Sequence, residues 1–158
     1  MSSSIVYCPC QSKKRYADCC LPLHLGQETA VNAEALMRSR YTAYVLQKID
    51  YIVQTTALAQ QDLLDLSEML TWSKETHWDG LDVIKQQAKT TKRHAQVEFK
   101  AFYQTTQGRA YHHELSTFVY IDDRWYFLDP TVDLAITMKQ PCLCGSGQKF
   151  KHCCAVYL

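Results

Sequence analysis

The chain has 158 residues, a length that suits one ordinary domain or one domain with small appendages. Hydrophobic residues make up 47% of it, which allows a buried core, and a net charge of +1 gives no global case for nucleic-acid binding. No apolar run approaches the roughly 18 residues of a membrane span, and the first seven residues lack the features of a secretory signal. We therefore expect no membrane association and a cytoplasmic protein whose thiols stay reduced.

All eight cysteines lie in two segments, 8–20 and 142–154, and each segment reads Cys-x-Cys, eight residues, Cys-Cys. In an extended chain residues i and i+2 point the same way, so Cys-x-Cys offers two sulfurs from one edge. The loop then returns the second pair, and four thiolates at roughly 2.3 Å satisfy tetrahedral Zn²⁺. We expect two structural zinc ions per chain. The predicted ligands are Cys8, Cys10, Cys19, Cys20, Cys142, Cys144, Cys153 and Cys154.

Three other uses of these cysteines are less favoured. Iron–sulfur clusters have different usual spacings, disulfides would follow oxidation, and four closed thiolates leave no free nucleophile for catalysis. The two loops also differ: the second has Gly145 and Gly147 where the first has Gln11 and Lys13. We expect the first loop to be more strained and to hold its metal less tightly.

Helical periodicity follows the first cysteine segment. It predicts a helix over 33–45 that is capped by Asn32, and a short continuation over 51–53 that is capped by Asp50. A third helix is predicted over 61–70. These helices precede any strand pattern in the chain.

The period then changes from 3.6 to 2, which indicates strands. The dipeptides Asp79-Gly80, Gln107-Gly108 and Asp122-Asp123 predict turns. The predicted strand segments are 81–83, 95–103, 111–121 and 125–128. Helices followed by an antiparallel sheet predict an α+β fold, with the N-terminal helices packed on one face of a curved sheet above a concave pocket.

Asp129-Pro130 ends the last strand, and the moderately polar segment after it is expected to dock on the domain. We divide the chain into an N-terminal zinc knuckle, 1–24, a middle domain, 25–130, a tether, 131–141, and a C-terminal zinc knuckle, 142–158.

The repeated cysteine pattern resembles the SEC-C zinc motif found at the C-terminus of the SecA translocation motor. The whole arrangement resembles the bacterial YchJ family, and the resemblance covers nearly the whole chain. It is carried, besides the cysteines, by the stretches 33–41 and 76–81 and by His113, Glu114, Ser116, Phe118, Trp125 and Tyr126. The resemblance implies an NTF2-like cone between two SEC-C-like knuckles, and it implies no defined activity.

An enzymatic interpretation would rest on polar residues of the cone. The weak catalytic candidates are His113, Glu114 and Asp129, with His112 and His77 nearby in the sequence. His113 could be a general base in an aromatic-lined pocket or, as we favour, a hydrogen-bonded core histidine. Arg40 is expected to pair with Glu114 or Asp129.

We expect a binding or adaptor module whose knuckles dock a protein or nucleic-acid partner. A ribosomal or chaperone partner is suggested only by analogy with SecA. The alternative is an enzyme or small-molecule binder that uses the cone and His113, and a third hypothesis is redox or zinc sensing. The basic loop residues compensate the charge of a zinc–thiolate centre or form a patch for an acidic partner; they are Lys13, Lys14, Arg15, Lys149 and Lys151. Dimerisation through the sheet stays open.

Overall fold

The structure is a computed structural model that describes residues 6–87 and 91–158. One antiparallel sheet has the strand order β1-β2-β3-β4. Its strands are β1, His77–Gln87; β2, His94–Thr105; β3, Gly108–Ile121; and β4, Arg124–Leu128. The α-helices are α1, Leu21–His24; α2, Ala33–Val45; α3, Ile49–Gln54; and α4, Leu66–Glu75. Short 3₁₀ segments are η1, Tyr16–Asp18; η2, Leu58–Leu63; η3, Phe150–His152; and η4, Cys154–Tyr157. This arrangement confirms the predicted α+β class.

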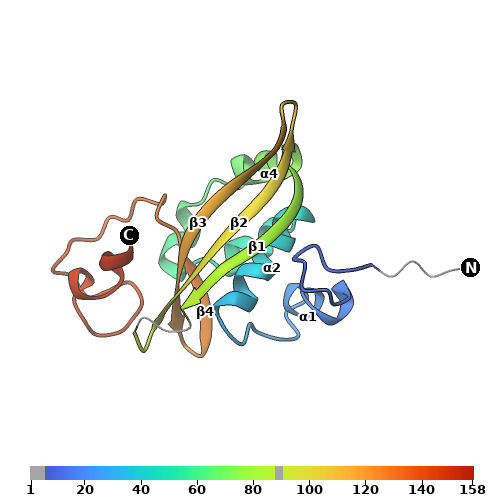
Figure 1. Ribbon diagram of the computed structural model, residues 1–158. Helices are drawn as coiled ribbons and strands as arrows, with labels where there is room; N and C mark the ends of the chain where they lie inside the picture. The colour runs from blue at the N-terminus through green and yellow to red at the C-terminus, as the bar shows by residue number, and fades with distance from the viewer. Residues whose placement is uncertain (1–5, 88–90) are drawn as a thin grey trace, which may run out of the picture.

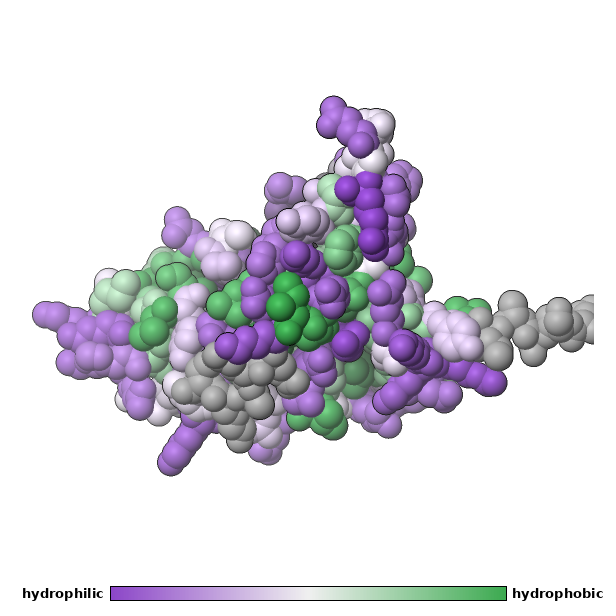
Figure 2. Space-filling model, in the orientation of Figure 1, coloured by the Kyte–Doolittle hydropathy of each residue, from purple (hydrophilic) through white to green (hydrophobic). Residues whose placement is uncertain are grey.

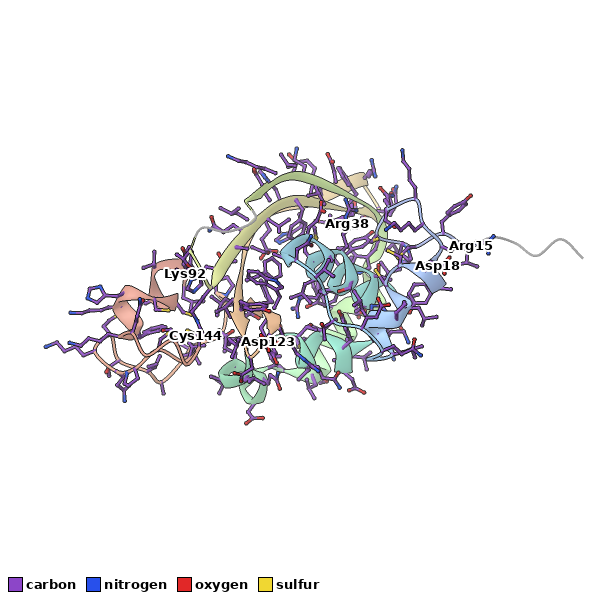
Figure 3. All side chains as sticks on the ribbon, turned by 90° about the horizontal axis from the view of Figure 1, so that it is seen from below. Arg15, Asp18, Arg38, Lys92, Asp123 and Cys144 are labelled. Atoms are coloured by element: carbon purple, nitrogen blue, oxygen red, sulfur yellow. The ribbon has the colours of Figure 1, made fainter. Side chains whose placement is uncertain are left out.

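The helix α2 lies inside the curve of the sheet, which arches over it (Figures 1 and 3). Its start matches the prediction, because the Asn32 side-chain oxygen accepts a hydrogen bond from the Ala35 amide at 2.8 Å. Leu36 and Met37 on this helix are buried against Phe118 on the sheet. The main core therefore sits between α2 and the concave face.

Alternation along β3 and β4 divides the sheet into two faces. Phe118 and its neighbour across the strands, Phe127, pack into the concave side, with their ring centroids 5.8 Å apart. Val119 and its partner Tyr126 belong to a second apolar cluster, which contains the C-terminal cysteines. The sheet is thus covered on both sides near β4. Further along, its outer face is a mixture of polar and apolar surface (Figure 2).

Three predicted boundaries were wrong. Residues Asp79 and Gly80 form no turn, because β1 runs through them with a register shift between Trp78 and Gly80 against β2. Gly80 serves close packing instead: its amide donates to the Tyr41 hydroxyl at 3.0 Å, and an added Cβ would lie 2.8 Å from Arg109 Nη2. The hairpin turns at 107–108 and 122–123 are confirmed by the pairing of β2 with β3 and of β3 with β4.

The third predicted helix begins later than expected. A 3₁₀ segment, η2, precedes it, and α4 starts after Asp65, whose carboxylate accepts from the Glu68 amide at 3.0 Å. An aspartate cap explains this start, because it satisfies an amide that the first turn leaves free. Asp50 likewise lies in the first turn of α3 rather than at its cap, which is Lys48.

The two cysteine segments lie at opposite ends of the molecule, beside α1 and beyond β4 (Figure 1). In Figure 3 the labelled Arg15 and Asp18 mark one end, and Cys144 marks the other. The segment between β4 and the second cysteines has no helix or strand, yet it is docked through Ile136, which packs against the second apolar cluster. Within the described ranges, no helix is long and apolar enough to cross a membrane.

Candidate metal centres

The two cysteine segments have the same backbone. In the first, the Cys8 amide donates to the Lys14 carbonyl at 2.9 Å and the Gln11 amide to the Cys8 carbonyl at 3.1 Å. In the second, the equivalent bonds run from Cys142 to Gln148 at 2.8 Å and from Gly145 to Cys142 at 3.2 Å. Each segment then closes with a 3₁₀ turn before its Cys-Cys pair. The repeat in the sequence is therefore a repeat in three dimensions.

Each segment brings its four sulfurs together, and the four ligand atoms lie within 4.8 Å of one another in both clusters. The separation is 3.6 Å between the Cys10 and Cys19 sulfurs and 3.5 Å between the Cys144 and Cys153 sulfurs. A tetrahedron with Zn–S bonds of roughly 2.3 Å has edges of about 3.8 Å, so the clusters fit a metal of this size. The separations exceed the roughly 2.0 Å of a disulfide, and all eight cysteines are free. Both clusters could hold a metal ion.

A serine in each loop faces the cluster. The Ser12 hydroxyl lies 3.2 Å from the Cys19 sulfur, and the Ser146 hydroxyl donates to the Cys153 sulfur at 3.3 Å. The same serine oxygens accept from the amides of Lys14 and Gln148, two residues later. Hydroxyl donors to sulfur stabilise the thiolate that a metal requires.

The thiols of each cluster perturb one another. Hydrogen bonds from the neighbouring sulfur of Cys154 are the main cause that lowers the pKa of Cys144 to about 3, while burial raises the pKa of Cys153 to about 11. In the first cluster, the sulfur of Cys20 lowers the pKa of Cys10 in the same way, and burial raises that of Cys19 to about 11. Without a cation, one thiolate therefore forms at the expense of its neighbours. A divalent metal would remove this conflict by stabilising all four.

The N-terminal cluster is part of the main core. Cys8, Cys10 and Cys20 are at most 4% exposed and pack in the cluster of residues that contains Leu36 and Phe118. Arg38 on α2 donates to the Cys10 carbonyl at 2.7 Å. This module is thus held to α2 by both apolar packing and a charged hydrogen bond.

The C-terminal cluster docks on the outer face of the sheet, against Val119 and Tyr126. Arg93 donates to the Cys144 carbonyl at 2.7 Å, which repeats the contact of Arg38 with Cys10. The ring of His94, which is 2% exposed, places Nε2 at 3.3 Å from the Cys154 sulfur and Nδ1 at 2.8 Å from the Thr91 hydroxyl. A hydroxyl that donates to Nδ1 leaves the proton on Nε2, which can then donate to the sulfur.

Sequence reasoning missed His94, Arg93 and Arg38 as supports of the clusters. Spacing in the sequence carries no signal for Arg93, which precedes β2, or for His94, which begins it, because both lie far from the cysteines along the chain. Each cluster also has an aromatic residue packed with it: Phe150 is 5% exposed and lies among the C-terminal cysteines, and Tyr16 packs against the main core.

The polar residues of the cone are only partly brought together. Glu114 and Asp129 line a cavity on the concave side of the sheet, as does His112. His113 lies on the opposite face, is exposed, and places Nε2 at 2.7 Å from Glu98 Oε2. His77 begins β1 and is exposed. His113 is therefore neither a core histidine nor a general base in the cavity, because β3 alternation points it outward.

Arg40 also differs from expectation. Within the described part of the chain it has no carboxylate partner within 4.0 Å; its Nη1 donates to the Ile52 carbonyl at 2.8 Å and to the Thr55 hydroxyl at 2.7 Å. The last turn of α3 leaves carbonyls without helical partners, and the guanidinium satisfies one of them.

Comparison with known proteins agrees with this architecture. The family model described as "YchJ, middle NTF2-like domain" matches residues 32–130, and the SEC-C motif model matches residues 138–155. A UPF0225 protein of Actinobacillus succinogenes is 52% identical over 151 residues, which cover 96% of this chain and 97% of the relative. A UPF0225 protein of Haemophilus influenzae strain 86-028NP is 54% identical over 155 residues, which cover 98% of this chain and 95% of the relative.

Two solved structures are similar. A crystal structure of a SEC-C motif containing protein from Psychrobacter arcticus gives a TM-score of 0.93 at 52% identity, covering 96% of both chains. A solution structure of a SEC-C motif containing protein from Rhodopseudomonas palustris gives 0.71 at 39% identity, covering 80% of this chain and 98% of the other. These matches confirm the NTF2-like domain and the family resemblance inferred from the sequence.

Proposed function

We propose that this chain, which belongs to the YchJ family, is a zinc-stabilised docking protein. Its C-terminal knuckle binds an acidic segment of a partner protein. Each Cys₄ cluster would hold one Zn²⁺ in a closed, four-sulfur site. Such a site has no open position for water or substrate, so its role is structural. The metal supplies folding energy to a segment too short to order itself.

The observation that carries the docking proposal is the division of the C-terminal knuckle into a buried and an exposed set. Its four cysteines and Phe150 are buried, while Lys149, Lys151 and His152 are exposed. Residues 134–158 contain three lysines and no acidic residue. Met138, whose carbonyl accepts from the Lys151 amide, is 57% exposed, and Val156 of the same segment is 67% exposed. A basic surface with apolar side chains suits an acidic, partly apolar peptide.

A protein partner fits this surface better than single-stranded nucleic acid does. Binding of single strands uses exposed aromatic rings on which the bases stack. In this knuckle Phe150 is buried, and the ring of Tyr157 packs on His94 with centroids 4.7 Å apart. The knuckle thus offers charge and apolar contact without a stacking platform.

The test uses zinc-loaded, immobilised protein and a bacterial lysate treated with nuclease. The double variant Lys149→Glu, Lys151→Glu should lose the captured protein while the zinc content stays at two ions, because neither lysine is a ligand. The matched controls are Lys13→Glu with Lys14→Glu on the first knuckle, and His113→Gln on the outer face of the sheet. Capture that survives the charge reversal, or that nuclease abolishes, would refute the proposal.

A further inference from the structure

A cavity of about 240 Å³ lies between α2, α4 and the concave face of the sheet. Pockets for drug-sized ligands measure roughly 300–1,000 Å³, so this one suits a smaller molecule. Its wall combines aromatic rings with charged groups, and the proposed docking function uses none of them.

The positive group on the wall is Arg40, which is 8% exposed. Its guanidinium carbon lies 4.5 Å above the centroid of the Phe127 ring. All of its hydrogen bonds to described residues come from Nη1, which leaves Nε and Nη2 without such a bond. No carboxylate of the described chain lies within 4.0 Å of it. A buried charge without a direct counterion is costly, and an anionic ligand group would relieve that cost.

Two negative groups line the same cavity. Glu114 Oε2 lies 3.3 Å from His112 Nε2 at the rim, and its side chain is 30% exposed. Asp129 Oδ1 accepts from the Thr131 amide at 2.9 Å. The cavity therefore holds fixed charges of both signs that do not pair with one another. A ligand with one charge would meet repulsion from part of the wall.

Between the charges the wall is aromatic. The rings of Trp72 and Trp78 meet edge to face with centroids 5.2 Å apart, and Tyr44 lies 5.1 Å from Trp72. The indole nitrogen of Trp78 is buried and has no hydrogen-bond partner among the residues that the structure describes. The wall can thus contact an apolar ring.

We propose that this cavity binds a small zwitterion with an aromatic or large apolar group, of the size and chemistry of an aromatic amino acid. The carboxylate of the ligand meets Arg40, its ammonium group meets Glu114 or Asp129, and its ring contacts Trp72 and Trp78. A zwitterion alone satisfies both signs of charge on the wall. This inference does not depend on the docking function, because it uses the opposite side of the sheet from the C-terminal knuckle.

Three probes of one shape separate the charges: L-phenylalanine, 3-phenylpropionate, which lacks the ammonium group, and phenethylamine, which lacks the carboxylate. Calorimetric titration should give the tightest binding for phenylalanine, with the other two weaker by roughly tenfold or more, the effect of losing one charge-assisted hydrogen bond. In nitrogen–proton NMR spectra, phenylalanine should shift the indole signal of Trp78 and leave that of Trp125 unchanged.

Variants then assign the contacts. Arg40→Gln should weaken the binding of phenylalanine and 3-phenylpropionate but not that of phenethylamine. Glu114→Gln together with Asp129→Asn should weaken the binding of phenylalanine and phenethylamine but not that of 3-phenylpropionate. Since Arg40 also supports α3, the acidic pair keeps the test decisive if Arg40→Gln misfolds. Glu98→Gln on the outer face is the matched control and should change nothing. Binding of none of the probes at millimolar concentration, equal binding of 3-phenylpropionate and phenylalanine, or insensitivity to the acidic variants would overturn the proposal.

Discussion

Gln11 and Gly145 occupy equivalent positions in the two cysteine loops, and both have left-handed backbones, with φ of 62° and 75°. The next pair shows the same relationship: Lys13 has φ of 70° and Gly147 has φ of 82°. The N-terminal loop therefore adopts the glycine conformation with two residues that carry side chains. For such residues the left-handed region costs roughly 1–2 kcal/mol each.

This difference predicts a reciprocal exchange. Lys13→Gly should remove strain from the first loop and slow release of its metal to a chelator, whereas Gly147→Lys should add strain to the second loop and speed release there. Each change is expected to alter the stability of its loop by roughly 1 kcal/mol. The measurement is the rate of metal transfer to a coloured chelator, with both variants compared to the parent. Equal rates in all three proteins would contradict the strain argument.

The two clusters should differ in what their loss does to the fold. Cys144→Ser should release one zinc ion and leave cooperative unfolding of the NTF2-like domain in place, since that cluster packs on the outer face of the sheet. Cys10→Ser should release one ion and also lower the melting temperature of the domain, because the Cys10 side chain, 0% exposed, lies in the core with Leu36. Elemental analysis and calorimetry check both. Loss of the whole transition in Cys144→Ser would show that the second module also belongs to the central core.

His94 should control how tightly the second cluster keeps its metal. His94→Phe removes the nitrogen that lies 3.3 Å from the Cys154 sulfur but keeps a ring against Tyr157. Loss of such a supporting group costs roughly 10–100-fold in metal affinity. Competition with a chelator of known affinity measures the change, and Thr91→Val, which removes only the hydroxyl near Nδ1, should give a smaller effect. Unchanged affinity in His94→Phe would mean that the imidazole serves packing alone.

Local signals in the sequence were sufficient for much of this structure. The Asn32 cap and the two hairpin turns depend on residues close together in the chain, and their predictions are confirmed. The cysteine repeat is equally local, and it correctly indicated that the four sulfurs of each segment come together. Asp79-Gly80 looks the same as a turn in the sequence. What keeps it within β1 is pairing with β2 and the fit of Gly80 beneath Arg109, which only the tertiary structure supplies.

The candidate sites show the same limit. Alternation along β3 places His112 and Glu114 on one face and His113 on the other, but the sequence pattern alone does not say which face is concave. The partners of Arg40, and the histidine and arginines that support the clusters, come from distant segments. Their selection depends on packing of α2 and β2 against the modules, for which a single sequence carries no spacing signal.

His24 links the first module to α2 and should make stability depend on pH. Its Nε2 lies 2.9 Å from the Ser39 carbonyl, so Nε2 carries a proton, and Nδ1 accepts from the Tyr16 hydroxyl at 2.8 Å. Burial lowers the pKa of His24, against the opposing effect of the hydrogen bond to Ser39. Protonation of Nδ1 would also remove the lone pair that accepts from Tyr16, so the hydroxyl would have to reverse its role.

The sign follows from proton binding. Because the pKa of His24 is lower in the folded protein than its ordinary value of roughly 6.5, the unfolded chain binds more protons, and stability falls as pH falls from about 7 through that range. His24→Gln should flatten this dependence, since its amide can keep both hydrogen bonds and does not titrate. The measurement is the free energy of unfolding in urea from pH 5.5 to 7.5, with zinc content checked at every point so that metal loss is not mistaken for the effect of the histidine.

Tyr16→Phe is the companion control: it removes the bond to Nδ1, so it should lower stability at neutral pH and leave part of the slope, because His24 stays buried. A slope that persists unchanged in His24→Gln would assign the pH dependence to other groups, and a slope of opposite sign in the parent protein would show that the pKa of His24 is raised in the folded state.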